Sequence, residues 1–220
     1  MELEFYIIHS TELQLRKDNV EKMITTLVKS GAKCNSHYIL ENDPHEIDRV
    51  SLVDLINNKP PEDLPEDSIL RKLSQSFHIR QVSNLMKHKE AIRRISECTN
   101  KSTYHIIIED DIVYPLDIYD QMHNMFKQIT HDYDVLFLGL PATEDYKEKE
   151  VIKNVFDKFN ILPCIDSYII TPSAAKNLHD SLLPFYFPTN VQLSYCMKKI
   201  GINAMFTVPN LFADGSKVGV

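Results

Sequence analysis

The segment that most constrains this chain is residues 104–108 (YHIII), a β-branched and aromatic run that ends directly in three carboxylates, Glu109, Asp110 and Asp111. Such a run is typical of a strand buried in a sheet. The carboxylates then lie at the carboxyl end of that strand, which is where open α/β sheets bind their ligands. Three adjacent carboxylates repel one another unless a cation or an arginine neutralises them. The segment therefore predicts a polar site at the edge of an α/β sheet.

Side-chain alternation divides the three carboxylates between the two sides of the strand. Glu109 and Asp111 are expected to point one way, and Asp110 the other way, toward the helix side, where it holds the turn. An acidic pair separated by one residue suits a hard divalent cation that keeps coordination positions open for phosphate oxygens. We therefore predict a metal site at Glu109 and Asp111. The alternative interpretation is a solvated acidic loop.

The order of the other predicted elements favours a parallel sheet. A strand at 5–8, a helix at 15–29 that ends near Gly31, and a strand at 37–40 form a first strand–helix–strand unit. Because we find no internal repeat and no clear linker, we interpret residues 1–220 as one domain. We also predict helices at 81–98, 116–128, 173–182 and 191–200, strands at 134–140, 165–171 and 204–208, irregular segments at 57–68 and 143–153, and a tight turn at 214–216.

Composition argues against several classes of protein. The chain has 220 residues, a hydrophobic fraction of 43% and a formal net charge of −7, whereas proteins that bind nucleic acids present basic surfaces. No apolar run approaches the roughly 20 residues of a transmembrane helix, and the N-terminus lacks the pattern of a signal peptide. The four cysteines are far apart and form no Cys-x-x-Cys pair, so we expect a reduced, cytoplasmic environment.

The motifs of several enzyme classes are missing. The chain has only five glycines, and it contains neither a Walker loop nor a Gly-x-Gly-x-x-Gly motif nor a Gly-x-Ser-x-Gly elbow. A metal held by carboxylates is therefore the remaining obvious way for this chain to bind a diphosphate. Enzymes that use nucleotide sugars bind their donors in this way.

Five segments resemble the glycosyltransferase family 25, the lipopolysaccharide-biosynthesis and collagen-galactosyltransferase-like proteins. The central match is a helix carrying His88 that is followed by the strand ending in Glu-Asp-Asp. The likeness is strongest in the middle of the chain and loose over residues 1–75, where His9, Ser10 and Arg16 resemble the opening strand and turn. The five segments, in family order, are 83–92 (SNLMKHKEAI), 105–112 (HIIIEDDI), 133–139 (YDVLFLG), 167–176 (SYIITPSAAK) and 214–219 (DGSKVG).

The resemblance implies a glycosyltransferase of the GT-A fold, with a Rossmann-like, mixed but mostly parallel sheet flanked by helices. It implies a nucleotide-diphosphate sugar as donor, with a UDP-sugar favoured and galactose or another hexose as the sugar, and Mn²⁺ or Mg²⁺ as cofactor. The acceptor would be a hydroxyl of a glycan, glycoprotein or glycolipid. Asp111 is the first metal ligand on this interpretation, and Glu109 assists it or contacts the ribose or sugar.

The remaining candidates for donor binding are His9, Ser10, Arg16, His88 and Asp110. His88 lies on the apolar stripe of its predicted helix and points toward the sheet, so the alternative for it is a hydrogen-bonded core histidine. For Arg16 the alternative is solvation on a helix.

The resemblance also implies inversion at the anomeric carbon, which requires a general base. Asp166 is the candidate for this base, and Asp214 is the reserve, as a base or as an additional metal ligand. The structural alternatives are a solvated strand start for Asp166 and a turn beside Gly215 for Asp214.

Two positions depart from the family pattern. Lys87 stands where a serine usually precedes the histidine, and Asn190 stands where an aspartate follows a proline. The second departure keeps a noncatalytic protein that binds a glycan or a partner as an alternative. A metal-dependent phosphoesterase is another alternative, although it would be expected to carry several acidic or histidine clusters.

Overall fold

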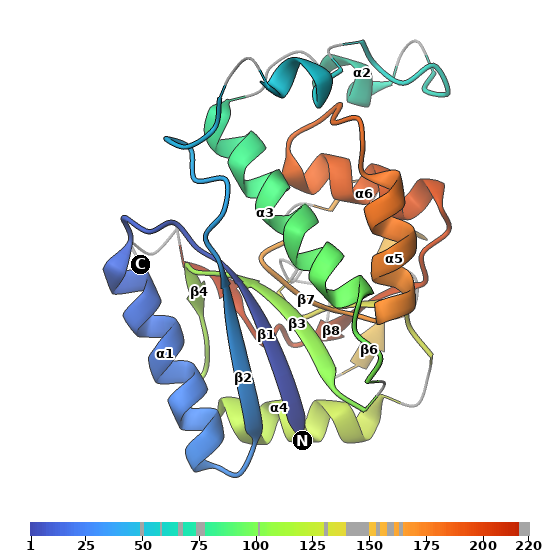
Figure 1. Ribbon diagram of the computed structural model, residues 1–220. Coiled ribbons are helices and arrows are strands. Elements are labelled where there is room, and N and C mark those ends of the chain that lie inside the picture. Colours follow the sequence, from blue (N-terminus) through green and yellow to red (C-terminus); the bar gives the residue numbers. More distant parts are fainter. Residues whose placement is uncertain are drawn as a thin grey trace.

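The computed structural model describes residues 1–48, 51–57, 59–65, 68–73, 78–100, 102–129, 132–139, 150–152, 155–157, 161–162 and 165–215. Within these residues the main sheet has seven strands in the order β2-β1-β3-β7-β5-β8-β6, and β4 and β9 form a second, two-stranded sheet (Figure 1). The strands are β1 (Glu2–Ile8), β2 (Lys33–Ile39), β3 (Tyr104–Glu109), β4 (Ile112–Val113), β5 (Val135–Phe137), β6 (Glu150–Ile152), β7 (Ser167–Ile170), β8 (Ala204–Val208) and β9 (Ala213–Asp214). The helices are α1 (Gln14–Lys29), α2 (Ile69–Leu73), α3 (Ile79–Ser96), α4 (Ile118–Gln128), α5 (Pro172–Ser181) and α6 (Thr189–Lys199), with short 3₁₀ turns at Ser51–Asp54 and Val155–Asp157.

The main sheet is mixed, with five of the seven strands running in one direction. β1 pairs in parallel with β2 and β3, and β5 pairs in parallel with β8. β7 is antiparallel to both of its neighbours, and β6 is antiparallel to β8. This confirms the fold class expected from the sequence, a mostly parallel sheet flanked by helices, and it is consistent with a Rossmann-like GT-A fold.

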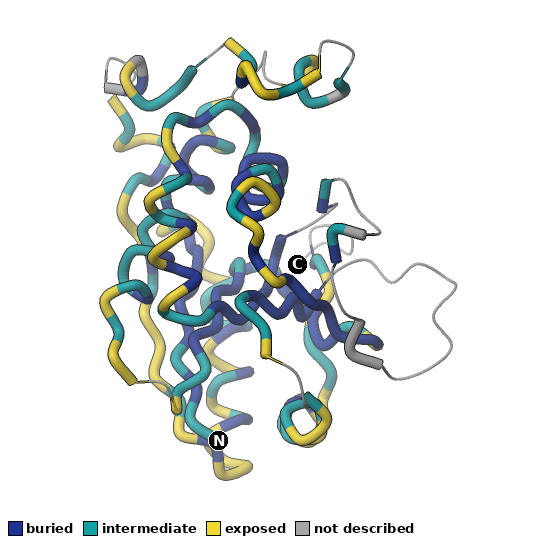
Figure 2. Tube along the Cα trace, turned by 90° about the vertical axis from the view of Figure 1, so that its right-hand side faces the viewer, coloured by how far each residue is buried: buried dark blue, intermediate teal, exposed yellow. Residues whose placement is uncertain are grey.

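Helices cover both faces of the main sheet. One face packs against α1 and α4 through a cluster that includes Phe5, Ile7 and Met23, whereas the other packs against α3, α5 and α6 through a cluster that includes Ile107 and Tyr168. The inner strands β3, β5, β7 and β8 are mostly buried, whereas the edge strand β2 is largely exposed (Figure 2). Because side chains alternate along each strand, a residue's position in β1 or β3 determines which helical layer it meets.

Local sequence signals account for the ends of several elements. Gly31 has a φ of 102° directly after α1, a conformation that glycine adopts at low cost. Pro172 occupies the first turn of α5, and the side chain of Thr171 accepts a hydrogen bond from the amide of Ala174. These signals confirm the predicted starts or ends of α1 and α5.

Three predicted segments differ from the structure. Most of the excursion expected at 143–153 lies outside the described residues, but Glu150–Ile152 forms β6, which pairs with β8. The turn expected at 214–216 is wrong at its first residue, since Asp214 belongs to β9 and pairs with Ile112; residue 216 lies outside the described residues. The strand expected at 134–140 is shorter, and α2 follows the irregular segment at 57–68.

None of the helices in the described part of the chain has both the length and the apolar character that a membrane span requires.

Candidate functional site

A pocket of about 620 Å³ opens at the carboxyl ends of β1 and β3. These ends are adjacent because Ile8 pairs with Glu109 in the parallel register of the two strands. The first turns of α3 and the segments after β1 and β2 complete the wall. The lining includes His9, Ser10, Glu12, Leu13, Arg16, Pro44, His45, Arg80, Ser83, Asn84, Lys87, Glu109 and Asp110.

Glu109 faces α3, two positions after Ile107, whose side chain lies on the same side of the sheet. Its Oε1 accepts a hydrogen bond from Nδ2 of Asn84 at 3.0 Å and lies 3.2 Å from Nε2 of His88. Nδ1 of His88 lies 3.0 Å from the hydroxyl of Tyr168, and the two rings stack. Because a carboxylate only accepts, the arrangement places the histidine proton on Nε2 and lets Tyr168 donate to Nδ1.

His88 itself is fully buried. It is not among the residues that line the pocket. This geometry therefore does not favour the expected contact between the His88 ring and the donor. The ring contacts Glu109 instead.

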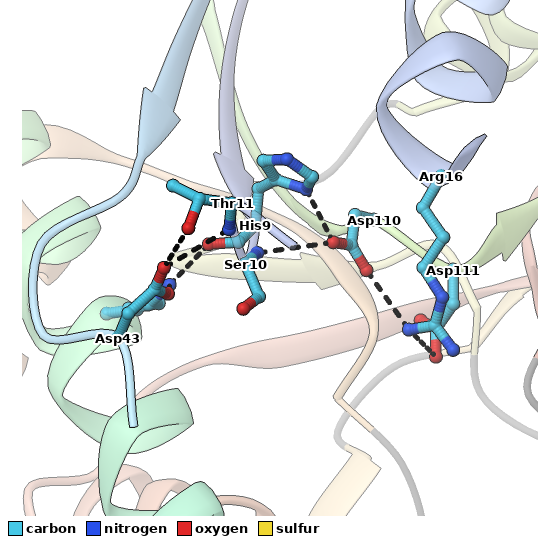
Figure 3. Close-up of polar contacts among 8 residues, drawn as sticks. His9, Ser10, Thr11, Arg16, Asp43, Asp110 and Asp111 are labelled. Carbon is cyan, nitrogen blue, oxygen red and sulfur yellow. Dashed lines mark hydrogen bonds and ion pairs between the residues drawn. The ribbon is translucent and has the colours of Figure 1, made fainter. Parts of the chain in front are cut away.

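Asp110 lies on the opposite side of β3 from Glu109 and is 5% exposed. Nδ1 of His9 is 2.7 Å from its Oδ2, and the amide of Ser10 donates to the same oxygen at 3.4 Å (Figure 3). Its other oxygen accepts a hydrogen bond from Arg16 at 3.2 Å. The predicted group His9, Ser10, Arg16 and Asp110 is thus brought together in space.

Asp111 also pairs with Arg16, through an Nη1–Oδ2 distance of 3.2 Å. Arg16 therefore joins Asp111 to Asp110, while the charge of Glu109 also acts on Asp111, so the strict alternation expected for the three carboxylates does not hold beyond Glu109, where β3 ends. Burial, and then the charge of Glu109, raises the pKa of Asp111 to about 6. The charges of Asp110 and Asp214 act in the same direction, and Arg16 opposes them.

Asp214 reaches this group through the small sheet. It pairs with Ile112, the residue after Asp111, and the amide of Gly215 donates to the Asp111 carbonyl at 2.7 Å. Arg16 thus pairs with Asp110 and Asp111, and the charges of Glu109 and Asp214 also act on Asp111.

Asp166 lies directly opposite Glu109. The amide of Glu109 donates to the carbonyl of Asp166 at 2.8 Å, continuing the antiparallel pairing of Ile108 with Ser167. Opposite residues of an antiparallel pair project to the same face, so the Asp166 side chain shares the α3 face with Glu109. Asp166 is 8% exposed, not a solvated strand start.

Within the described part of the chain, no group of three or more histidine, cysteine, aspartate or glutamate side chains is arranged so that it could hold a metal ion by itself. The pairs of carboxylates at this edge are nevertheless hard oxygen donors. Such donors suit Mg²⁺, which is commonly held by one or two carboxylates together with substrate phosphates.

Sequence reasoning missed Asp43 and the role of Lys87. Asp43 is fully buried, and Lys87 is 3% exposed. The Lys87 ammonium donates to Oδ1 of Asp43 and to the carbonyl of His9. Asp43 Oδ2 accepts from the Thr11 amide at 3.1 Å and from its hydroxyl at 2.8 Å. In the sequence Lys87 stands out only as a departure from the family motif, and Asp43 stands in no motif.

The second departure from the family pattern, Asn190, has a local explanation. Nδ2 of Asn190 donates to the carbonyl of Leu162 at 3.1 Å, and the Asn190 carbonyl accepts from the hydroxyl of Ser194. Asn190 therefore supports the start of α6. It does not line the pocket at the end of β3.

No protein-family model matches the chain, and no curated protein matches it. Among solved structures, the chain is similar to mouse xyloside xylosyltransferase 1 in its apo form, with 8% sequence identity and a TM-score of 0.37. The similarity covers 91% of this chain and 82% of that one. At this identity and TM-score the likeness bears on neither substrate nor mechanism.

Proposed function

We propose that this protein is a metal-dependent glycosyltransferase that moves a sugar from a nucleotide-diphosphate donor, with a UDP-sugar favoured, to a hydroxyl of a glycan, glycoprotein or glycolipid. The observation that carries the proposal is the crowding of carboxylates around Asp111, beside a pocket at the carboxyl ends of β1 and β3. Burial first, and then the neighbouring negative charges led by Glu109, raise the pKa of Asp111. The motif resemblance to family 25 supports the same assignment.

The donor set fits Mn²⁺ or Mg²⁺. Asp111 and Glu109 would hold the ion as first ligands, and Asp214, whose charge also acts on Asp111, remains the reserve ligand. When bound, the ion would supply positive charge that stabilises the negative charge developing on the leaving nucleotide. Diphosphate oxygens would complete a ligand set that the described side chains do not complete alone.

The pocket supplies the groups that would bind the nucleotide. His9, Ser10 and Arg16 line it after β1, and Arg16 is 28% exposed, so its guanidinium is accessible to a phosphate. Oδ1 of Asn84 is buried and has no hydrogen-bond partner in the described part of the chain, so it could accept a hydroxyl of the donor. His88 would act through Glu109, by fixing the orientation of that carboxylate.

We assign the general base to Asp166. Its side chain lies on the same face as Glu109, directly across the β3–β7 pair, and it is buried rather than solvated. The base would take the proton of the acceptor hydroxyl as that oxygen attacks the anomeric carbon. Asp214 would serve the metal site instead.

Release of nucleoside diphosphate from a panel of UDP- and GDP-sugars, in Mn²⁺ and in EDTA, tests the proposal. Metal-dependent release is expected from one class of donor, and Asp111→Ala should abolish it. Asp166→Asn should lose turnover but keep metal-dependent binding of the nucleotide. Asp180→Asn, a control on the exposed side of α5, should behave as wild type. Turnover by Asp166→Asn would contradict the base assignment alone, whereas wild-type protein inactive on every donor would contradict the enzyme assignment.

A further inference from the structure

A continuous polar network joins Asp43 to Asp111 (Figure 3), and its members His9, Arg16, Lys87 and Asp110 line the pocket. Lys87 and Thr11 bind Asp43; Lys87 also binds the His9 carbonyl; the His9 ring binds Asp110; and Arg16 joins Asp110 to Asp111. The network connects the segments after β1, β2 and β3 with helix α3. It therefore links Asp111, the proposed metal ligand, to Asp43 and Lys87, which are distant from it in the sequence.

Lys87 and Asp43 together hold the two ends of the three-residue segment His9–Ser10–Thr11. Lys87 fixes the carbonyl of His9, and Asp43 accepts from both the amide and the hydroxyl of Thr11. Ser10 lies between these anchors, and its amide donates to Asp110. The position of the segment against Asp110 thus depends on contacts made behind it.

The ion pair of Lys87 and Asp43 is buried. Burial alone would raise the pKa of Asp43, but hydrogen bonds from Lys87 and Thr11 outweigh it and lower this pKa to about 2. The hydroxyl of Ser83 donates to the carbonyl of Asn42 at 2.6 Å, so the residue before Asp43 is also attached to α3. The Asp43 carboxylate is therefore charged at neutral pH, and it forms a buried ion pair with Lys87.

We propose that Lys87 and Asp43 are positioning residues of the donor site: they hold residues 9–11 so that His9 and Ser10 fix the carboxylate of Asp110 beside the metal edge. The inference rests on the proposed function for its consequence, which is nucleotide affinity. Its structural content, the dependence of the His9–Asp110 contact on Lys87, can be measured without a ligand. Outer residues that orient metal-site groups commonly change metal affinity about 10–100-fold when they are replaced.

The test compares Lys87→Met with the double variant Lys87→Met/Asp43→Asn. The methionine keeps most of the length of the lysine, and the double variant has no unpaired buried charge, so its thermal stability should recover toward wild type. The His9 carbonyl lacks its donor in both variants. We therefore expect the ring resonances of His9, measured by NMR without ligand at fixed pH, to shift in both.

The same variants should bind UDP in Mn²⁺ about 10–100-fold more weakly than wild type, including the double variant whose stability has recovered. Lys199→Met serves as control: Lys199, at the end of α6, pairs with Asp63 and touches nothing in the network. The affinity of this variant for UDP and its His9 resonances should match those of wild type.

Recovery of affinity together with stability in the double variant would overturn the proposal, because the pair would then be structural only. Weaker binding with unchanged His9 resonances would also overturn it, since Lys87 would then act directly on the nucleotide. If wild-type protein binds no nucleotide but Lys87→Met still shifts His9, the proposed function fails while the positioning role stands.

Discussion

The environment of Asp111 disfavours its charged form in the folded protein. Its carboxylate is held near Glu109, Asp110 and Asp214, and Arg16 compensates only part of that charge. The pKa of Asp111 is raised from 3.8 to about 6. Because the folded state holds its proton more tightly than the unfolded state, the contribution of Asp111 to stability is present below about pH 4 and is lost as pH rises through about 6.

Asp111→Asn should therefore stabilise the metal-free protein at about pH 7.5. A pKa displacement of this size corresponds to roughly 3 kcal/mol, and loss of the Arg16 pair offsets part of it, so we expect a net gain of about 1–2 kcal/mol, which raises Tm by roughly 2–8 °C. Thermal unfolding in EDTA measures the change.

Asp180→Asn is the matched control for this gain, because Asp180 lies at an exposed position on α5, where its recorded pairing is with His179. Its Tm should stay close to that of wild type. A fall in the Tm of Asp111→Asn would contradict the electrostatic account of the site.

Gly139 permits a close approach of chains just beyond β5. A Cβ at this position would lie 2.6 Å from Oγ of Ser167 and 3.1 Å from the carbonyl oxygen of Phe212. Both distances are shorter than ordinary van der Waals contact, so a larger side chain forces one of the neighbours to move.

Gly139→Ala should consequently lower the free energy of unfolding by about 1–3 kcal/mol, as overpacking of a close-packed interior does. Adding Ser167→Ala removes the shorter contact and should restore part of the loss; the contact with Phe212 prevents full recovery. Urea unfolding of the single and double variants checks this. Equal stability of Gly139→Ala and wild type would show that the backbone relaxes there without cost.

Strand β3 carries different chemistry at its two ends. Its carboxyl end holds the acidic site, whereas its second residue, His105, lies 3% exposed beside Tyr6, with the hydroxyl of Tyr6 3.4 Å from Nδ1. Nε2 of His105 is buried and has no hydrogen-bond partner among the residues that the structure describes. Burial lowers the pKa of His105 from 6.5, so the folded protein favours the neutral ring.

The depressed pKa of His105 predicts loss of stability in acid. Below about pH 6.5 the unfolded chain binds a proton that the folded chain resists, so the free energy of unfolding rises with pH across this range. Urea unfolding at about pH 5 and about pH 7.5 should show a smaller pH-dependent difference for His105→Gln than for wild type. The opposite contribution of Asp111 is present in both proteins and cancels; equal differences in the two would contradict the assignment to His105.

Helix α3 joins the core to the site. Its apolar stripe, which includes Leu85 and Ile92, packs on the sheet, while Asn84 and Lys87 reach the pocket wall. The same 3.6-residue period that predicted the stripe also predicted that His88 points inward. Periodicity could not tell whether His88 meets a ligand or a protein group, because that depends on Glu109, which approaches from another strand.

For the molecule as a whole, local sequence patterns predicted the structural features that depend on residues close together in the sequence. The parallel pairing of β1 and β2 followed from a strand, a helix and a strand in succession, and the end of α1 followed from Gly31. The antiparallel insertion of β7 between β3 and β5 depends on contacts between distant segments, for which the sequence carries no local signal.

The same distinction applies to the site. The acidic end of β3 was visible because it follows a clear strand, and Arg16, Asp110 and His9 were found through the motif resemblance. Asp43 was not found, because its role depends on contacts with Thr11 and Lys87, which are distant in the sequence. The side on which Asp111 lies depends on where β3 stops, and composition does not encode that boundary.

Calorimetric titration of wild-type protein and Asp111→Asn with UDP, and with GDP for comparison, in Mn²⁺ and then in EDTA, tests the central claim most directly. The account predicts binding of one nucleotide by wild type in Mn²⁺, with loss of that binding in EDTA and in the variant. Equal binding in EDTA, equal binding by Asp111→Asn, or no binding of either nucleotide would contradict a metal-assisted diphosphate site at the end of β3.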